Sequence, residues 1–156
     1  MCRATEEFLL SHSYAQNHIH LVFSTKSRQR FINKSIQKRL WAYIAGICKN
    51  HQMLAFAVGG TEDHVHVLYR LPPIMTLVES VAVIKANSSK WIRPQLPKFA
   101  WQKGYGAFSV SSSKVSEVIR YIDDQEAHHR KISFEQEFVT MLRKHGIEYD
   151  PEFVFG

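Results

Sequence analysis

Alternating apolar and polar side chains mark the first patterned stretch of the chain, from Asn17 to Thr25. Successive side chains of a strand point to opposite faces of a sheet. One face then carries Ile19, Leu21 and Phe23, and the other carries His18, His20, Val22 and Ser24. The pattern therefore predicts a first strand with one apolar face.

Two longer stretches repeat their apolar residues at helical spacing instead. They run from about Lys34 to Asn50 and from about Leu77 to Arg93. Thr76 and Glu79 stand just before the second stretch at the spacing of a capping box, in which each side chain satisfies a free backbone N–H of the other residue. The predicted buried positions are Ile36, Leu40, Ile44, Ile47 and Cys48 in the first helix, and Leu77, Val81, Ile84 and Trp91 in the second.

Turn signals separate the remaining elements. Gly59-Gly60 predicts a hairpin turn, and Pro72-Pro73 ends the strand that follows it. Three serines, Ser111 to Ser113, offer N-caps for a third helix. The further predicted elements are strands over Met53–Val58, Thr61–Arg70 and Gly104–Val110, and helices over about Lys114–Lys131 and Glu135–Lys144.

The order of the first six elements is strand, helix, strand, strand, helix, strand. With right-handed crossovers, this order predicts an α+β fold of the ferredoxin-like (RRM-like) split βαβ type, a four-stranded antiparallel sheet with helices on one face. The strand over Thr61–Arg70 lies centrally, and a C-terminal helix carries Tyr121. We expect a single domain over residues 1–156, with a core at about 14–131 and a tail at about 132–156.

Length and composition agree with one globular domain. The 156 residues are 45% apolar, and the formal net charge of +6 favours a polyanionic partner. The two cysteines, Cys2 and Cys48, form no CxxC pair, so neither a disulfide framework nor a structural zinc site is expected, and a reduced cytoplasmic location fits best. The segment Met1–Leu10 does not read as a signal peptide, and no apolar run reaches the ~20 residues of a membrane span.

Two histidines stand one residue apart on the third predicted strand, as His64-Val65-His66. Strand alternation places both imidazoles on one face, where they can grip a metal ion, and places Val65 and Val67 on the other. If the helices cover the valine face, the histidines point to an uncovered face, which needs a lid or a ligand. The alternative is that they are polar residues on the wet side of a half-buried strand.

The third predicted helix presents Tyr121 and Gln125 one turn apart, with His128 a further turn on. They lie beside an apolar stripe of Val115, Val118, Ile119 and Ile122. A phenol and a metal-capable amide oxygen are thus presented together. The alternative is an amphipathic helix whose tyrosine and glutamine border a core.

Three sequence blocks together resemble the single-tyrosine HUH transposases of the smallest insertion sequences. The blocks are His64-Val65-His66, then Trp101-Gln102-Lys103-Gly104-Tyr105-Gly106-Ala107-Phe108, and then Tyr121-Ile122-x-x-Gln125 followed by Glu126-Ala127-His128-His129-Arg130-Lys131. The resemblance extends from about Tyr14 to Phe138.

The resemblance implies a metal-dependent transposase that cleaves and rejoins single-stranded DNA near hairpin ends. Tyr121 would attack a DNA phosphate to give a 5′-phosphotyrosine and a free 3′-OH, while His64, His66 and Gln125 would hold a divalent cation. Members of the family work as homodimers in which the tyrosine helix of one subunit acts in trans. Because a phenol with a pKa of ~10 is a poor nucleophile at neutral pH, a cation that stabilises charge on the phosphate is chemically reasonable.

The identity of the cation stays open between Mg²⁺ and Mn²⁺, since imidazole and amide ligands suit manganese and cellular abundance favours magnesium. Zinc is less expected, because nothing in the sequence clearly offers a third histidine, cysteine or carboxylate. Asp63 should point away from the histidine face, and Glu62 should at most support the site from outside.

Other basic and histidine residues receive weaker predictions. His18 and His20 are expected at the surface or against DNA, and His128 and His129 are expected to be cations at a helix end. Candidate phosphate contacts are Arg28, Arg30, Lys85, Lys90, Arg93 and Lys103. Two other functions remain possible, a non-catalytic single-stranded nucleic-acid-binding module and a domesticated HUH nuclease acting on repeated hairpins.

Overall fold

Four antiparallel strands form the sheet, in the order β2-β3-β1-β4. They are β1 (Asn17–Ser24), β2 (Leu54–Gly60), β3 (His64–Leu71) and β4 (Gly106–Val110). The computed structural model describes residues 14–155, so the Met1–Leu10 segment and Cys2 lie outside the described residues. The predicted α+β split βαβ topology is confirmed, with the histidine strand β3 in the interior of the sheet.

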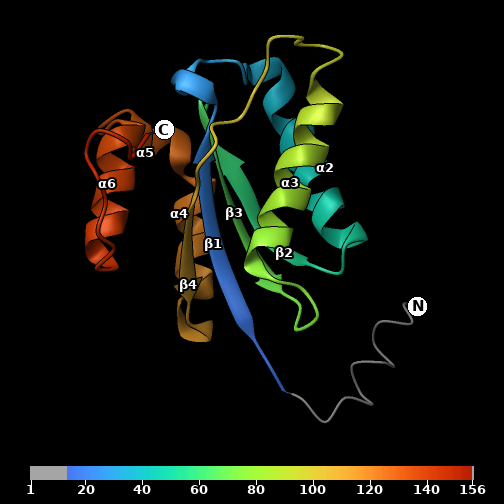
Figure 1. Cartoon of the computed structure of the whole chain (residues 1–156), viewed down its shortest axis with the longest axis vertical. Helices are drawn as coiled ribbons and strands as arrows, with labels where there is room; N and C mark the ends of the chain where they lie inside the picture. Colours follow the sequence, from blue (N-terminus) through green and yellow to red (C-terminus); the bar gives the residue numbers. More distant parts are fainter. Residues whose placement is uncertain (1–13, 156) are drawn as a thin grey trace.

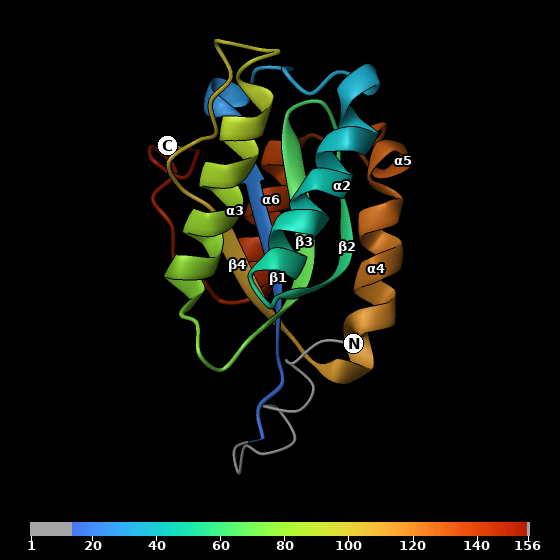
Figure 2. The same cartoon turned by 90° about the vertical axis from the view of Figure 1, so that its right-hand side faces the viewer.

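Two helices, α2 (Lys34–Asn50) and α3 (Leu77–Ile92), cover one face of the sheet (Figure 2). Asn33 caps α2 by accepting a hydrogen bond from the backbone N–H of Ser35, and the predicted capping box of Thr76 and Glu79 starts α3. The core between these layers includes Val65 and Val67, as expected for the valine side of β3. Leu77 and Trp91, predicted to be buried, are only partly so.

The region after β4 differs most from the prediction. In place of one helix over Lys114–Lys131 there are a short 3-10 helix η2 (Ser112–Lys114) and two helices, α4 (Val115–Asp123) and α5 (Gln125–His129). The backbone leaves helical geometry at Asp124, with φ −100° and ψ 19°. The predicted serine cap is also absent, because Lys114 precedes α4 and provides no side-chain cap. The bend at Asp124 lets the chain turn across the sheet.

The last helix, α6 (Phe134–Lys144), lies on the side of the sheet opposite α2 and α3 (Figure 1). It packs through Phe134, Phe138 and Leu142 against Val22 and Phe108. A second 3-10 turn, η1 (Lys26–Arg28), follows β1. The face that was expected to be uncovered therefore has a lid made by the chain itself.

Helix α4 follows the β2 edge of the sheet (Figure 2). Its approach depends on Gly59, because a Cβ at that position would lie 2.7 Å from the carbonyl oxygen of Ile122. Together α4 and α6 enclose the histidine face. Within residues 14–155 no helix has both the length and the apolar character needed to cross a membrane.

Candidate functional site

His64 and His66 project from the same face of β3, and both side chains are fully buried. Their ring centroids lie 5.2 Å apart. His64 faces Asp63 through Nδ1 at 2.8 Å, and His66 faces His20 through Nδ1 at 2.8 Å. In each ring Nδ1 is therefore occupied by a hydrogen-bond partner. The Nε2 atoms of both rings point toward a common centre, where they contact Gln125 and Glu137.

The surroundings of Asp63, His18 and His20 were predicted incorrectly. Asp63 lies in the turn before β3, so strand alternation does not direct its carboxylate away from His64. His18 and His20 are only 4% and 5% exposed, because α4 and α6 enclose the face that the sequence suggested was open. Glu62 forms an ion pair with Arg30 at 3.5 Å, and its support of the site from outside stays a prediction.

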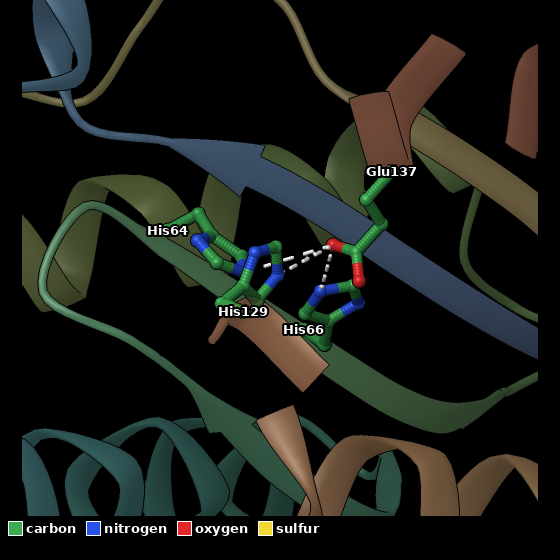
Figure 3. A group of neighbouring side chains, drawn as sticks. All are labelled: His64, His66, His129 and Glu137. Atoms are coloured by element: carbon green, nitrogen blue, oxygen red, sulfur yellow. Dashed lines mark hydrogen bonds and ion pairs between the residues drawn. The ribbon is translucent and has the colours of Figure 1, made fainter. Parts of the chain in front are cut away.

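A buried carboxylate, Glu137 of α6, completes a group with three histidines, His64, His66 and His129 (Figure 3). Their potential ligand atoms all lie within 4.8 Å of one another. Oε1 of Glu137 is 2.9 Å from Nε2 of His66, 3.2 Å from Nε2 of His129 and 3.7 Å from Nε2 of His64. Such a donor set fits a divalent cation.

Sequence reasoning did not identify Glu137, and it assigned His129 to a helix end. One signal was available for Glu137. It stands within the apolar stripe of α6, between Phe134 and Phe138, where an acidic residue is unexpected in a helix that packs on a sheet. For His129 the signal was its position four residues after Gln125, which places the two side chains on one helical face.

Gln125 lies beside this group. Its side chain is 1% exposed, and its Oε1 lies 3.1 Å from Nε2 of His64 and 3.0 Å from Nε2 of His129. The helix break at Asp124 separates Gln125 from the helix that carries Tyr121, yet both side chains reach the centre. The amide oxygen is therefore placed as one more potential metal ligand.

Tyr121 reaches the histidines of its own chain from α4. Its ring centroid lies 5.7 Å from that of His66, and its hydroxyl donates a hydrogen bond to Oε2 of Glu137. Burial and the neighbouring negative charge of Glu137 both raise the pKa of the Tyr121 phenol. The tyrosine is consequently held protonated beside the potential metal ligands.

The charges within the group follow from burial. Burial lowers the pKa of His66 to about 4 and that of His20 to about 3, so both imidazoles are neutral near pH 7. Burial alone would raise the pKa of Glu137, but hydrogen bonds from His129 and His66 keep it below its ordinary value. Burial opposes protonation of His129, but the Glu137 carboxylate raises its pKa. The site combines an ionised carboxylate with the neutral imidazoles of His20 and His66.

A cavity of about 630 Å³ leads to the Tyr121 hydroxyl from the surface between β4, α4 and α6. Lys114, Lys144 and His145 line it, together with Glu137 and His128. A second cavity of about 690 Å³ lies beside His129 and is lined by Arg28, Arg30, Lys34 and Arg130 as well as acidic residues. Basic side chains thus approach the centre from two directions.

The six predicted phosphate contacts are divided between the two sides of the molecule. Arg28 and Arg30 line the cavity beside His129, where Arg28 pairs with Glu135. Lys85 donates hydrogen bonds to the carbonyls of Gln102, Lys103 and Gly104, at 2.6 to 3.2 Å. Lys85 and Lys90 lie on α3, and Arg93 directly follows it, so these residues belong to the face away from Tyr121. Lys103 is exposed in the loop before β4.

The sequence of the chain matches a known protein family. The profile of the family described as "Transposase IS200 like" matches residues 13–125. None of the curated protein sequences compared with the chain matches it.

Two solved structures share the fold. A candidate transposase from Deinococcus radiodurans has 20% sequence identity and a TM-score of 0.61, with 74% of this chain and 95% of that chain covered. A REP-associated tyrosine transposase bound to a REP hairpin has 15% identity and a TM-score of 0.57, with 76% and 72% covered. At these identities the likeness extends to the fold alone.

Proposed function

Because the chain belongs to the IS200-like transposase family, we propose that it cuts and rejoins single-stranded DNA through a covalent bond to Tyr121. The observation that carries the proposal is the position of the Tyr121 hydroxyl. It lies beside the buried group of His64, His66 and Gln125, at the inner end of a cavity lined by Lys114 and Lys144.

The reaction requires attack of the Tyr121 oxygen on a DNA phosphorus. The bond between phosphorus and the 3′ oxygen breaks, and the released oxygen takes up a proton to become a 3′-OH. The proton of the phenol has an acceptor in place, the Glu137 carboxylate to which it is already hydrogen-bonded. The phosphotyrosine ester retains the energy of the broken bond, so a second 3′-OH can attack it and release Tyr121.

His64, His66 and Gln125 fit a divalent cation, because the Gln125 oxygen and the imidazole Nε2 atoms converge in a buried space. When bound, a cation such as Mg²⁺ or Mn²⁺ supplies charge stabilisation at the phosphate oxygens. The side chains of this chain hold and orient the donors, and the surrounding helices exclude water from them.

A folded single strand is the substrate we propose. The REP-associated relative of the same fold is bound to a DNA hairpin. The cavity at Tyr121 carries two lysines and the polar residues Ser109, Ser111 and Thr140, which suit contacts with a phosphate backbone. We propose that this surface recognises the shape of hairpins near the ends of a mobile element.

The oligomeric arrangement is a separate part of the proposal. Family resemblance predicts a homodimer with the tyrosine helix acting in trans. Within a single chain, however, Tyr121 already contacts Glu137 and lies against His66. This contact supports a site that is assembled in cis, with the dimer retained as a prediction.

The alternative of a non-catalytic RRM-like module has less support. Such modules stack bases on the open face of their sheet. In this chain Val22 and Phe108 on that face are buried under α6, with exposed fractions of 0% and 2%.

The test is a search for the covalent adduct. The full chain is mixed with a pool of hairpin oligonucleotides that have randomised single-stranded flanks, a 3′ fluorescent label, and Mn²⁺ or Mg²⁺. A 5′-phosphotyrosine leaves the labelled fragment on the protein, so a slow band is expected on a denaturing gel. Tyr121→Phe should abolish the band, and Tyr105→Phe, which changes an exposed tyrosine, should retain it. An adduct that survives in Tyr121→Phe, or labelled DNA that never joins the chain, would overturn the proposal.

A further inference from the structure

We propose that His129 and Glu137 are ligands of the same cation as His64, His66 and Gln125, so that the C-terminal helices close a five-donor centre that prefers a transition-metal ion to Mg²⁺. The inference rests on the proposed function for the purpose of the cation, but its geometry stands separately. Both added residues lie beyond the family match, which ends at residue 125.

The donor atoms are spaced as ligands of one ion would be. Two atoms bound to one ion at ~2.1 Å lie ~3.0 Å apart at a right angle and ~3.4 Å apart at a tetrahedral angle. Glu137 Oε1 lies 2.9, 3.2 and 3.7 Å from the three imidazole Nε2 atoms. Gln125 Oε1 lies 3.1 and 3.0 Å from two of them. The donors therefore already stand near the separations that a shared ion requires.

The imidazole rings are also oriented as metal ligands would be. A metal-bound histidine generally donates its second ring N–H to a carboxylate, a carbonyl or a similar partner. Nδ1 of His64 faces Asp63 at 2.8 Å, and Nδ1 of His129 faces the carbonyl of Ile132 at 2.9 Å. Nδ1 of His66 faces His20 at 2.8 Å. In all three rings the Nε2 atom is left to point at Glu137 Oε1.

The buried charge of Glu137 also favours a cation at this centre. Glu137 is 2% exposed, and among the described residues its ion-pair partners are histidines only, with no lysine or arginine. Burying a carboxylate without a compensating cation is costly. A divalent ion at the centre would place positive charge directly against this carboxylate.

The donor set then indicates which ions fit. Three imidazoles with one carboxylate and one amide oxygen suit Mn²⁺, Fe²⁺, Co²⁺ or Zn²⁺. Mg²⁺ prefers oxygen ligands and usually keeps several bound waters. This buried group offers three nitrogen donors and little space for water. Zinc was less expected from the sequence because no third histidine or carboxylate was clearly offered. His129 of α5 and Glu137 of α6 now lie where they would supply both.

The experiment measures metal binding directly. The full chain is stripped with EDTA and titrated with Mn²⁺ by calorimetry, and Co²⁺ is added separately because its visible absorption reports nitrogen ligands. His129→Asn and Glu137→Gln should each weaken Mn²⁺ binding by at least ~10-fold. Loss of a residue that only supports a metal ligand already weakens binding by ~10-fold or more, and loss of a ligand should cost no less. Mg²⁺ at equal concentration should not displace Mn²⁺.

Matched controls come from residues outside the centre. His51→Asn changes a histidine that directly follows α2, on the other face of the sheet. Glu135→Gln changes a carboxylate on the same helix that pairs with Arg28. Both should bind Mn²⁺ within about twofold of the unmodified chain, and circular dichroism should show that all four variants are folded.

The outcomes separate this inference from the proposed function. If His129→Asn and Glu137→Gln bind Mn²⁺ as tightly as the controls while His64→Asn loses binding, the added ligands are wrong and the transposase chemistry is untouched. If the ligand variants weaken binding as expected but no DNA adduct forms, the metal centre stands and the nuclease proposal fails.

Discussion

The hydroxyl of Tyr121 donates its hydrogen bond to Oε2 of Glu137, a residue 16 positions later on a different helix. The other oxygen of the same carboxylate faces the three imidazoles. One side chain of α6 therefore links the proposed nucleophile to the proposed metal ligands. The hydrogen bonds of Tyr121 and of the histidines therefore depend on the position of α6.

Replacing Glu137 should change the acidity of Tyr121. Burial and the Glu137 charge both raise the pKa of the phenol, so Glu137→Gln should lower it toward its ordinary value in the metal-free chain. The measurement is a pH titration of ¹³Cζ-labelled tyrosine by NMR, with Tyr121→Phe used to assign the signal. Tyr69, whose pKa is raised to about 12 chiefly by burial, is the internal control and should not move. An unchanged Tyr121 midpoint would show that the contact with Glu137 is not maintained in solution.

Enlarging Gly59 should displace the tyrosine helix. A Cβ there would lie 2.7 Å from the carbonyl oxygen of Ile122 and 3.0 Å from its Cγ2 atom, so Gly59→Ala should cost ~1–3 kcal/mol of unfolding free energy. It should also slow formation of the Tyr121 adduct, because α4 must shift. Urea denaturation and the adduct assay measure the two effects.

Gly46→Ala provides the matched comparison for Gly59. Gly46 lies within α2 and has no atom within 4 Å of the added methyl, so alanine should stabilise the chain by ~0.5–1 kcal/mol. Adduct formation should be unaltered. Equal effects of the two substitutions would contradict the close approach of α4 to β2.

The sheet and its two covering helices were predictable because their signals are local. Alternation in β1, the Thr76 and Glu79 capping box and the valine side of β3 each depend on neighbours in the sequence. These patterns fix which face of the sheet meets α2 and α3. They do not indicate where the helices that follow β4 pack on the sheet.

The completed site was not predictable, because its contacts join residues that lie far apart in the sequence. The contact between His66 and Glu137 spans 71 positions and depends on α6 packing over Val22 and Phe108. The break at Asp124 also has no strong local signal, since neither proline nor glycine stands there. Local patterns and the family resemblance therefore singled out His64, His66, Tyr121 and Gln125, but they did not single out His129 of α5 or Glu137 of α6.

The stability of the metal-free chain should fall in mild acid. The pKa of His20 is lowered to about 3 and that of His66 to about 4, from 6.5 for each, so below pH 6.5 the unfolded state binds more protons than the folded state. The free energy of unfolding should thus drop as the pH falls from 6.5 toward 4, by up to ~1.4 kcal/mol per pH unit for each histidine. The lowered pKa of Glu137 acts in the same direction below pH 4.5.

The pKa shift of His129 has the opposite effect on the pH dependence of stability. Its pKa is raised, so its contribution is complete below pH 6.5 and is lost as the pH rises through its folded-state value. Urea midpoints measured with EDTA between pH 4 and pH 8 test the balance. His20→Asn should flatten the acid slope, and His51→Asn at the end of α2 should leave it unchanged. A stability that rises toward pH 4 would contradict the buried neutral histidines.

Weakening the start of α6 should loosen that helix alone. Ser133 caps α6 in a capping box with Gln136, so Ser133→Ala should cost ~1 kcal/mol and speed hydrogen exchange of α6 amides by about fivefold if α6 opens separately from the sheet. Thr76→Ala removes the same kind of cap from α3 and should leave α6 exchange unchanged. Saturating Mn²⁺ should slow α6 exchange in the unmodified chain, because a ligand that binds only the closed form stabilises it. Glu137→Gln should remove most of this protection, and an equal slowing in that variant would mean that α6 is not tied to the metal through its carboxylate.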